Sequence, residues 1–134
     1  AASDVYKRQE LTVYGYTPMM VSVQCVQKTM DHCNHACVQY VLKDRYQKEF
    51  RGVCSCEFCY NTIYNTLPTS LLKEKEKAEK LGVKAYRLSF TIETQQETEK
   101  IVRAFVDVYL RGQKPDGQMQ TEETTKGHFQ RGVE

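Results

Sequence analysis

Short stretches in which hydrophobic and polar residues alternate predict several β-strands. Residues 10–16 (ELTVYGY) alternate before a glycine and predict a buried strand. Residues 85–92 (AYRLSFTI) show the same period and predict another. Between them, residues 19–23 (MMVSV) predict a short extended segment, and the weak alternation of residues 38–51 predicts a hairpin.

Two segments have the composition and spacing of helices. Residues 69–81 (TSLLKEKEKAEKL) are rich in helix formers, carry lysines and glutamates at close spacing, and precede Gly82, a residue typical of helix C-termini. Thr94 and Glu97 match a capping box, which predicts the start of a second helix that ends at Gly112. The apolar stripe of this second helix consists of Ile101, Val102, Phe105, Val108 and Tyr109.

The order of these elements predicts the fold class and the domain organisation. Strand, insert, helix, strand and helix over residues 10–112 indicate part of an α/β domain, with a small cysteine-rich β insert at residues 24–61. Residues 113–134 contain a Lys-Pro-Asp-Gly turn and little periodicity, so we expect a loop or linker. Residues 1–9 resemble a translated sequencing adapter, and we expect them to be a scar on an internal fragment of a longer protein.

All six cysteines of the chain lie between Cys25 and Cys59. Their spacing is Cys25-x7-Cys33-x3-Cys37, then sixteen residues, then Cys54-x-Cys56-x2-Cys59. A C-x2-C turn presents two thiolates together, as metal ions and iron-sulfur clusters require. The chemistry of this chain is therefore expected in this quarter of its length.

Spacing alone leaves several interpretations of the cysteines open. Cys33-x3-Cys37 followed by Cys56-x2-Cys59 approximates a zinc ribbon, with His32 and His35 as further ligands. Four cysteines can equally hold an iron-sulfur cluster. A disulfide framework is disfavoured because no secretory signal precedes the cluster, and reduced thiols without a metal would be open to oxidation.

Composition and charge narrow the function classes only slightly. The net charge of +2 and the pI near 8.2 are too small to indicate nucleic-acid binding by electrostatics alone. No apolar run approaches the roughly 20 residues that span a bilayer, and no signal-peptide pattern opens the chain. These features predict a cytoplasmic protein that does not bind a membrane.

Several motifs in a fixed order resemble a known family. They are ELTVYGYTPMM, the dipeptide Gln24-Cys25, KDRY, CEFCYNTIYN, RLSFTIE and TKGHFQRGVE. From Glu10 to the last residue, the chain thus resembles the collagenase-like peptidases, peptidase family U32. The resemblance implies a partial (β/α) barrel, the C-terminal part of a catalytic domain that acts on protein or peptide substrates. We expect this part alone to be inactive as a peptidase.

The same resemblance implies a cofactor site. Relatives in the family act in the hydroxylation of RNA bases or quinone precursors and carry an iron-sulfur cluster on four cysteines. By that likeness the ligands are Cys25, Cys33, Cys56 and Cys59, whereas Cys37 and Cys54 are extra thiols. Two alternatives to a peptidase follow: an iron-sulfur protein that supports hydroxylation of RNA or a small molecule, and a zinc-stabilised module without catalysis.

The sequence carries no familiar hydrolase motif such as H-E-x-x-H or G-x-S-x-G. Three residues are candidates for catalysis. His128 is a candidate acid or base because an unperturbed histidine side chain has a pKa near neutrality. Arg131 can bind a carboxylate or phosphate, and Glu93 would lie at the C-terminal rim of the predicted barrel. The alternative for each is a structural role in a loop or at a helix start.

Overall fold

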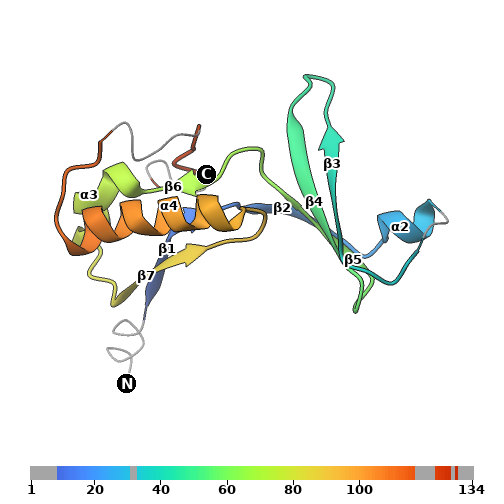
Figure 1. Cartoon of the computed structure of the whole chain (residues 1–134), viewed down its shortest axis with the longest axis horizontal. Helices are drawn as coiled ribbons and strands as arrows, with labels where there is room; N and C mark the ends of the chain where they lie inside the picture. Colours follow the sequence, from blue (N-terminus) through green and yellow to red (C-terminus); the bar gives the residue numbers. More distant parts are fainter. Residues whose placement is uncertain (1–8, 31–32, 117–122, 128, 130–134) are drawn as a thin grey trace. The chain divides into compact units, whose positions relative to one another are not determined.

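A computed structural model describes residues 9–30, 33–116, 123–127 and 129 of the chain (Figure 1). The chain divides into two compact units. Residues 1–15 and 67–134 form one of them, called here the α/β unit, and residues 16–66 form the other, called the cysteine unit. Each is described separately below.

The α/β unit contains a three-stranded sheet in the order β6-β1-β7. Its strands are β1 (Glu10–Gly15), β6 (Thr69–Ser70) and β7 (Ala85–Ser89). The central strand β1 runs parallel to β7 and antiparallel to β6. A Cβ atom at Gly15, which has φ +152°, would lie 2.8 Å from the carbonyl oxygen of Ser89, so this close approach of two strands requires glycine. The predicted strands at both positions are confirmed.

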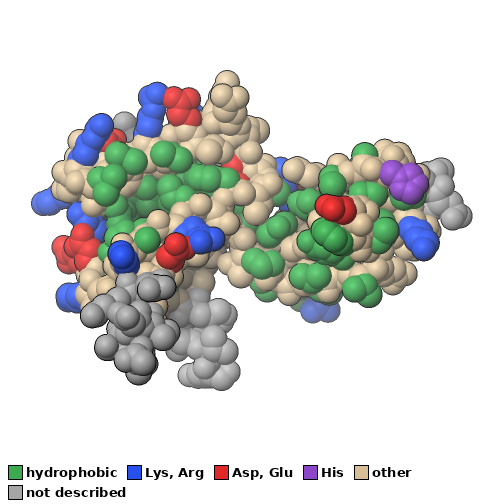
Figure 2. Space-filling view, turned by 90° about the horizontal axis from the view of Figure 1, so that it is seen from below, with side chains coloured by type: hydrophobic (Ala, Val, Ile, Leu, Met, Phe, Trp, Pro, Cys, Tyr) green, Lys and Arg blue, Asp and Glu red, His purple; other side chains and the backbone are tan. Residues whose placement is uncertain are grey.

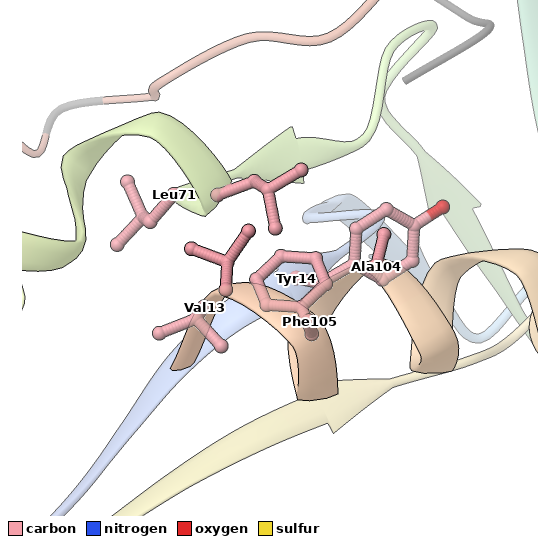
Figure 3. Packing of buried hydrophobic residues seen from close by; sticks show 7 residues of the cluster. Val13, Tyr14, Leu71, Ala104 and Phe105 are labelled. Carbon is pink, nitrogen blue, oxygen red and sulfur yellow. The ribbon is translucent and has the colours of Figure 1, made fainter. Parts of the chain in front are cut away.

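Helices pack on this sheet through an apolar face (Figure 1). They are η1 (Leu72–Glu74), α3 (Lys75–Lys80), α4 (Gln95–Phe105) and η2 (Val106–Leu110). The Thr94 and Glu97 side chains form the predicted capping box at the start of α4. Figure 3 shows how residues of β1, α4 and the segment before η1 meet in the core, whose buried members are Val13, Tyr14, Leu71, Leu72, Ala104, Phe105 and Val108.

The helix predicted over residues 69–81 is shorter than the sequence indicated. Its first two residues form β6 instead, because Ser70 pairs with Tyr14 of β1. The Leu71 amide then donates a hydrogen bond to the Val13 carbonyl, 2.8 Å away. Long-range pairing with the sheet therefore overrides the local helix preference at this end. The regular α-helix begins only at Lys75 and ends before Gly82, which has φ +64°.

The cysteine unit is built on a four-stranded antiparallel sheet in the order β2-β5-β4-β3. Its elements are β2 (Pro18–Ser22), α2 (Val26–Thr29), β3 (Val38–Lys43), β4 (Glu49–Ser55) and β5 (Tyr60–Tyr64). The predicted hairpin is confirmed as β3 and β4. Asp44 closes its turn, because its Oδ1 accepts hydrogen bonds from the amides of Tyr46 and Lys48 at 2.8 and 2.9 Å.

The cysteine unit leaves much apolar surface uncovered, and Figure 2 shows hydrophobic side chains on the displayed face of both units. Met19, Val21 and Val23, on or beside the edge strand β2, are 60 to 89% exposed. A pocket of about 250 Å³ in this unit is lined by further apolar side chains, among them Met20 and Leu42.

The prediction of a partial (β/α) barrel is wrong. In the described part of the chain, the strands form two separate sheets that do not close into a barrel. A barrel of this class needs parallel strands throughout, whereas β6 pairs antiparallel with β1 and the cysteine unit is entirely antiparallel. The protein is a small mixed α/β structure with a distinct cysteine-bearing sheet. Among the described residues, no helix is long and apolar enough to cross a membrane.

Candidate metal centre

The six cysteines lie at one end of the cysteine unit's sheet and in the segments that adjoin it. Cys25 immediately precedes α2, and Cys33 and Cys37 lie between α2 and β3. Cys54 is part of β4, and Cys56 and Cys59 belong to the four-residue turn between β4 and β5. All six are free thiols. The two halves of the sequence motif therefore meet because β3 and β4 pair, with Val38 opposite Cys54.

Three side chains form a group that could hold a metal ion: Cys33, His35 and Cys56. Their ligand atoms all lie within 4.8 Å of one another. Cys33 and His35 are exposed and Cys56 is half-buried, so an ion can reach the group from solvent. His35 has φ +54°, a conformation that few non-glycine residues adopt and that is typical of functional sites and tight turns.

The electrostatics of the group favour a bound cation. Burial and then the neighbouring Cys33 raise the pKa of the Cys56 thiol. Two thiolates this close repel one another, and a positive ion between them removes the repulsion and the cost of desolvation together. The protein environment thus disfavours the ionised form of Cys56 until a cation is present.

Cys25 and Cys54 form a second sulfur pair. Their Sγ atoms lie 3.4 Å apart, and both residues are buried. Hydrogen bonding by the backbone amide of Lys28, and then by Cys54, lowers the pKa of Cys25. Burial, followed by the contact with Cys25, raises the pKa of Cys54 to about 11. The pair therefore consists of one thiol with a lowered pKa and one with a raised pKa.

The remaining two cysteines are exposed. Cys59 has φ +52°, and its Sγ donates to the Cys56 carbonyl oxygen at 3.7 Å, which keeps both residues on one tight turn. Cys59 and Cys25 line a common pocket of about 370 Å³, together with Lys28 and three other residues. Cys37 is exposed in the strand-entry segment before β3.

Comparison with protein-family models, with curated proteins and with solved structures found no match. The resemblance to the collagenase-like peptidases therefore rests on the sequence motifs alone and stays a prediction.

Tyr40 packs beside the cysteines and depends on a glycine. Its ring lies over Gly52 of the neighbouring strand, where a Cβ atom would come within 2.2 Å of the ring. Its hydroxyl is buried and has no hydrogen-bond partner among the described residues. Burial first, and then Cys54 and Cys25, raise the pKa of Tyr40.

The structure brings together part of the predicted ligand set. Cys33 and Cys56 share one group, and His35, proposed from the sequence only as a spare ligand, joins them. Cys25 instead contacts Cys54, one of the two thiols interpreted as extra. The sequence signal for His35 was its position two residues from Cys33, although nothing in the spacing distinguished it from His32. The predicted four-cysteine set itself stays a prediction.

The predicted catalytic residues belong to a different part of the chain. Glu93 lies in the α/β unit between β7 and α4, where its Oε2 accepts hydrogen bonds from the amides of Thr91 and Ile92 at 2.7 and 3.0 Å. This carboxylate closes a local turn, and the barrel rim that motivated its choice is absent from the described fold. His128 and Arg131 lie outside the described residues.

Proposed function

We propose that the cysteine unit is a metal-binding module of a collagenase-like peptidase, and that its metal is a single zinc ion. The observation that carries the metal site is the convergence of Cys33, His35 and Cys56 within 4.8 Å. The sequence motifs support the peptidase, whose substrate would be a protein or peptide. A bound zinc ion would fix the segment before β3 to the turn between β4 and β5.

The donor set favours one ion over an iron-sulfur cluster. In a tetrahedral site with zinc–sulfur bonds of about 2.3 Å, two sulfur ligands lie about 3.8 Å apart. The observed limit of 4.8 Å is compatible with that spacing. A four-iron cluster holds its cysteine sulfurs on different irons and therefore farther apart. Mixed cysteine and histidine ligation is also common for structural zinc.

Cys59 completes the proposed set as the fourth ligand. It shares a C-x2-C turn with Cys56 and is exposed, so its side chain can rotate toward an ion without breaking a core contact. Cys25 is engaged with Cys54 and buried. The geometry thus favours a Cys3His site over the four-cysteine set that the family resemblance implies.

Metal analysis of four single variants tests this assignment. The full chain is purified without oxygen, and zinc, iron and acid-labile sulfide are measured per chain. We expect about one zinc in the wild type and in Cys37→Ser, the matched control, and a loss of at least tenfold in zinc affinity in Cys56→Ser and His35→Asn. Asparagine tolerates the positive φ of residue 35, so this variant removes the ligand and keeps the backbone.

The outcomes separate the alternatives. Zinc retained in His35→Asn but lost in Cys25→Ser would contradict the Cys3His set and support the four-cysteine set. Iron and sulfide in place of zinc, with loss of both in Cys56→Ser, would overturn the zinc proposal and favour the iron-sulfur protein that supports hydroxylation of RNA or a small molecule. A chain that binds neither zinc nor an iron-sulfur cluster would contradict the proposal of a metal-binding module.

The peptidase proposal has a separate test. Cleavage of gelatin and of collagen-like peptides by the full-length protein is followed by mass spectrometry of the products, with and without zinc. Cleavage at defined bonds supports the assignment. No cleavage under either condition counts against it and leaves the metal site unaffected, since metal content is measured independently.

A further inference from the structure

The geometry points to a reversible disulfide between Cys25 and Cys54, formed by exchange with a small anionic disulfide. The two sulfur atoms lie 3.4 Å apart although 29 residues separate them in sequence. Neither residue belongs to the metal group of Cys33, His35 and Cys56. The cysteine unit would thus carry a redox site beside its metal site, and the two sites would use different thiols.

The local structure allows the bond to form at small cost. An S–S bond of about 2.05 Å requires the sulfur atoms to approach by about 1.4 Å. Cys54 is fixed, because β4 pairs on both sides, with Val38 and with Asn61. Cys25 can move instead, since it lies in extended backbone before α2, a single turn without a buried residue.

A route from solvent leads to Cys25. This residue lines the pocket of about 370 Å³ that also contains Lys28. The lysine ammonium attracts a negatively charged reactant, such as the oxidised form of glutathione. Cys54 has an exposed fraction of 0% and is not open to direct attack. The order of the two steps therefore follows from access, with Cys25 first.

The exchange balances without any further reactant. The Cys25 thiolate attacks one sulfur of the small disulfide, and the bond that breaks releases the first small thiol. The Cys54 sulfur, on losing its proton, attacks the Cys25 sulfur of this mixed disulfide and releases the second. Two protein thiols are oxidised by two electrons, one disulfide is reduced to two thiols, and both protons leave on those products.

Thiol counting and peptide mapping test the proposal. The reduced full chain is incubated with oxidised glutathione in the presence of EDTA under native conditions. We expect free thiols, counted after denaturation, to fall from six to four, a mapped bond between Cys25 and Cys54, and full recovery with dithiothreitol. Cys37→Ser, the matched control, should lose two thiols in the same way. Cys25→Ser and Cys54→Ala should both lose the bond.

Two further results would overturn the proposal. One is a mapped bond that mainly joins other cysteines, and the other is a stable glutathione adduct on Cys25 that Cys54 does not displace. Because Cys54→Ala and Cys25→Ser both change buried residues, the fold of each variant is checked by its circular dichroism spectrum, and loss of the bond in a folded variant of either kind supports the pair. Cys56→Ser, which removes the proposed metal ligand, should still form the bond, so failure of the metal site and failure of the redox site are distinguishable.

Discussion

The buried carboxylate of Glu74 offers a quantitative test of how the α/β unit is held together. Its side chain is 9% exposed and accepts hydrogen bonds from the ammonium groups of Lys126 and of Lys77, the latter at 3.0 Å. Lys126 belongs to the segment near the end of the chain, which also pairs with β6 through Thr125. Glu74 therefore ties this segment to η1. We predict that Glu74→Gln loosens both.

The magnitude follows from the pKa of the carboxyl group. The hydrogen bonds from Lys126 and then Lys77 lower the pKa of Glu74 to about 2. Against an unfolded-state value of about 4.3, this difference corresponds to about 3 kcal/mol at neutral pH. The two lysines are 51 and 57% exposed, so solvent screening reduces the net effect. We expect Glu74→Gln to lower the free energy of unfolding by about 1 to 2 kcal/mol at pH 7.

The sign of the pH dependence distinguishes this explanation from a general loss of packing. Because the pKa of Glu74 is depressed in the folded state, its contribution is complete above about pH 5 and is lost as pH falls toward 2. At pH 3 roughly half of the contribution of Glu74 to the free energy of unfolding remains. The difference in unfolding free energy between the wild type and Glu74→Gln should therefore shrink by about half between pH 7 and pH 3.

Native-state hydrogen exchange of α4 amides is the suitable assay, because it reports the α/β unit even where the cysteine unit unfolds separately. Glu79→Gln is the matched control. Glu79 pairs with Lys75 at 3.5 Å on the surface of α3 and is 52% exposed, so its loss should cost less than about 0.5 kcal/mol. The same cost for both variants, or a Glu74→Gln effect that does not change with pH, would refute the reasoning.

Three other predictions concern packing, capping and cross-linking. Gly52→Ala should destabilise the cysteine unit by about 1 to 3 kcal/mol, because its methyl group would overlap the Tyr40 ring; hydrogen exchange of β3 and β4 amides measures this, and Tyr40→Ala in the same chain should abolish most of the effect if overlap is the cause. Thr94→Ala should cost about 1 kcal/mol through loss of the capping box, seen as faster exchange in the first turn of α4; unchanged rates there would contradict it. Oxidation of Cys25 and Cys54 to a disulfide should raise the free energy of unfolding of the cysteine unit in urea by about 3 to 4 kcal/mol, because the bond closes a loop in the unfolded chain. An unchanged urea midpoint of unfolding would contradict this prediction.

Elements whose determinants lie within a few residues of one another could be predicted from the sequence. The capping box of α4, the hairpin of β3 and β4, and the alternating strand β1 all form as predicted. In each case the determining groups are neighbours along the chain, such as the Thr94 and Glu97 side chains that bond each other's backbone amides. The C-x2-C spacing likewise placed Cys56 and Cys59 on one turn.

How these elements combine depends on contacts between distant parts of the chain. The helix pattern at Thr69 gave way to β6 because β1 supplied hydrogen-bond partners from a distant part of the chain. The antiparallel direction of that pairing excluded the expected barrel, and no local pattern encodes strand direction.

The cysteines illustrate the same limit at the candidate site. Spacing showed that six thiols lie near one another in sequence, whereas the pairing of β2 with β5, and of β4 with β3 and β5, decided which segments meet. In the resulting fold Cys25 contacts Cys54, and Cys56 lies with Cys33 and His35. Contacts between segments far apart in sequence determine which ligands converge, and the spacing of cysteines along the chain does not predict those contacts.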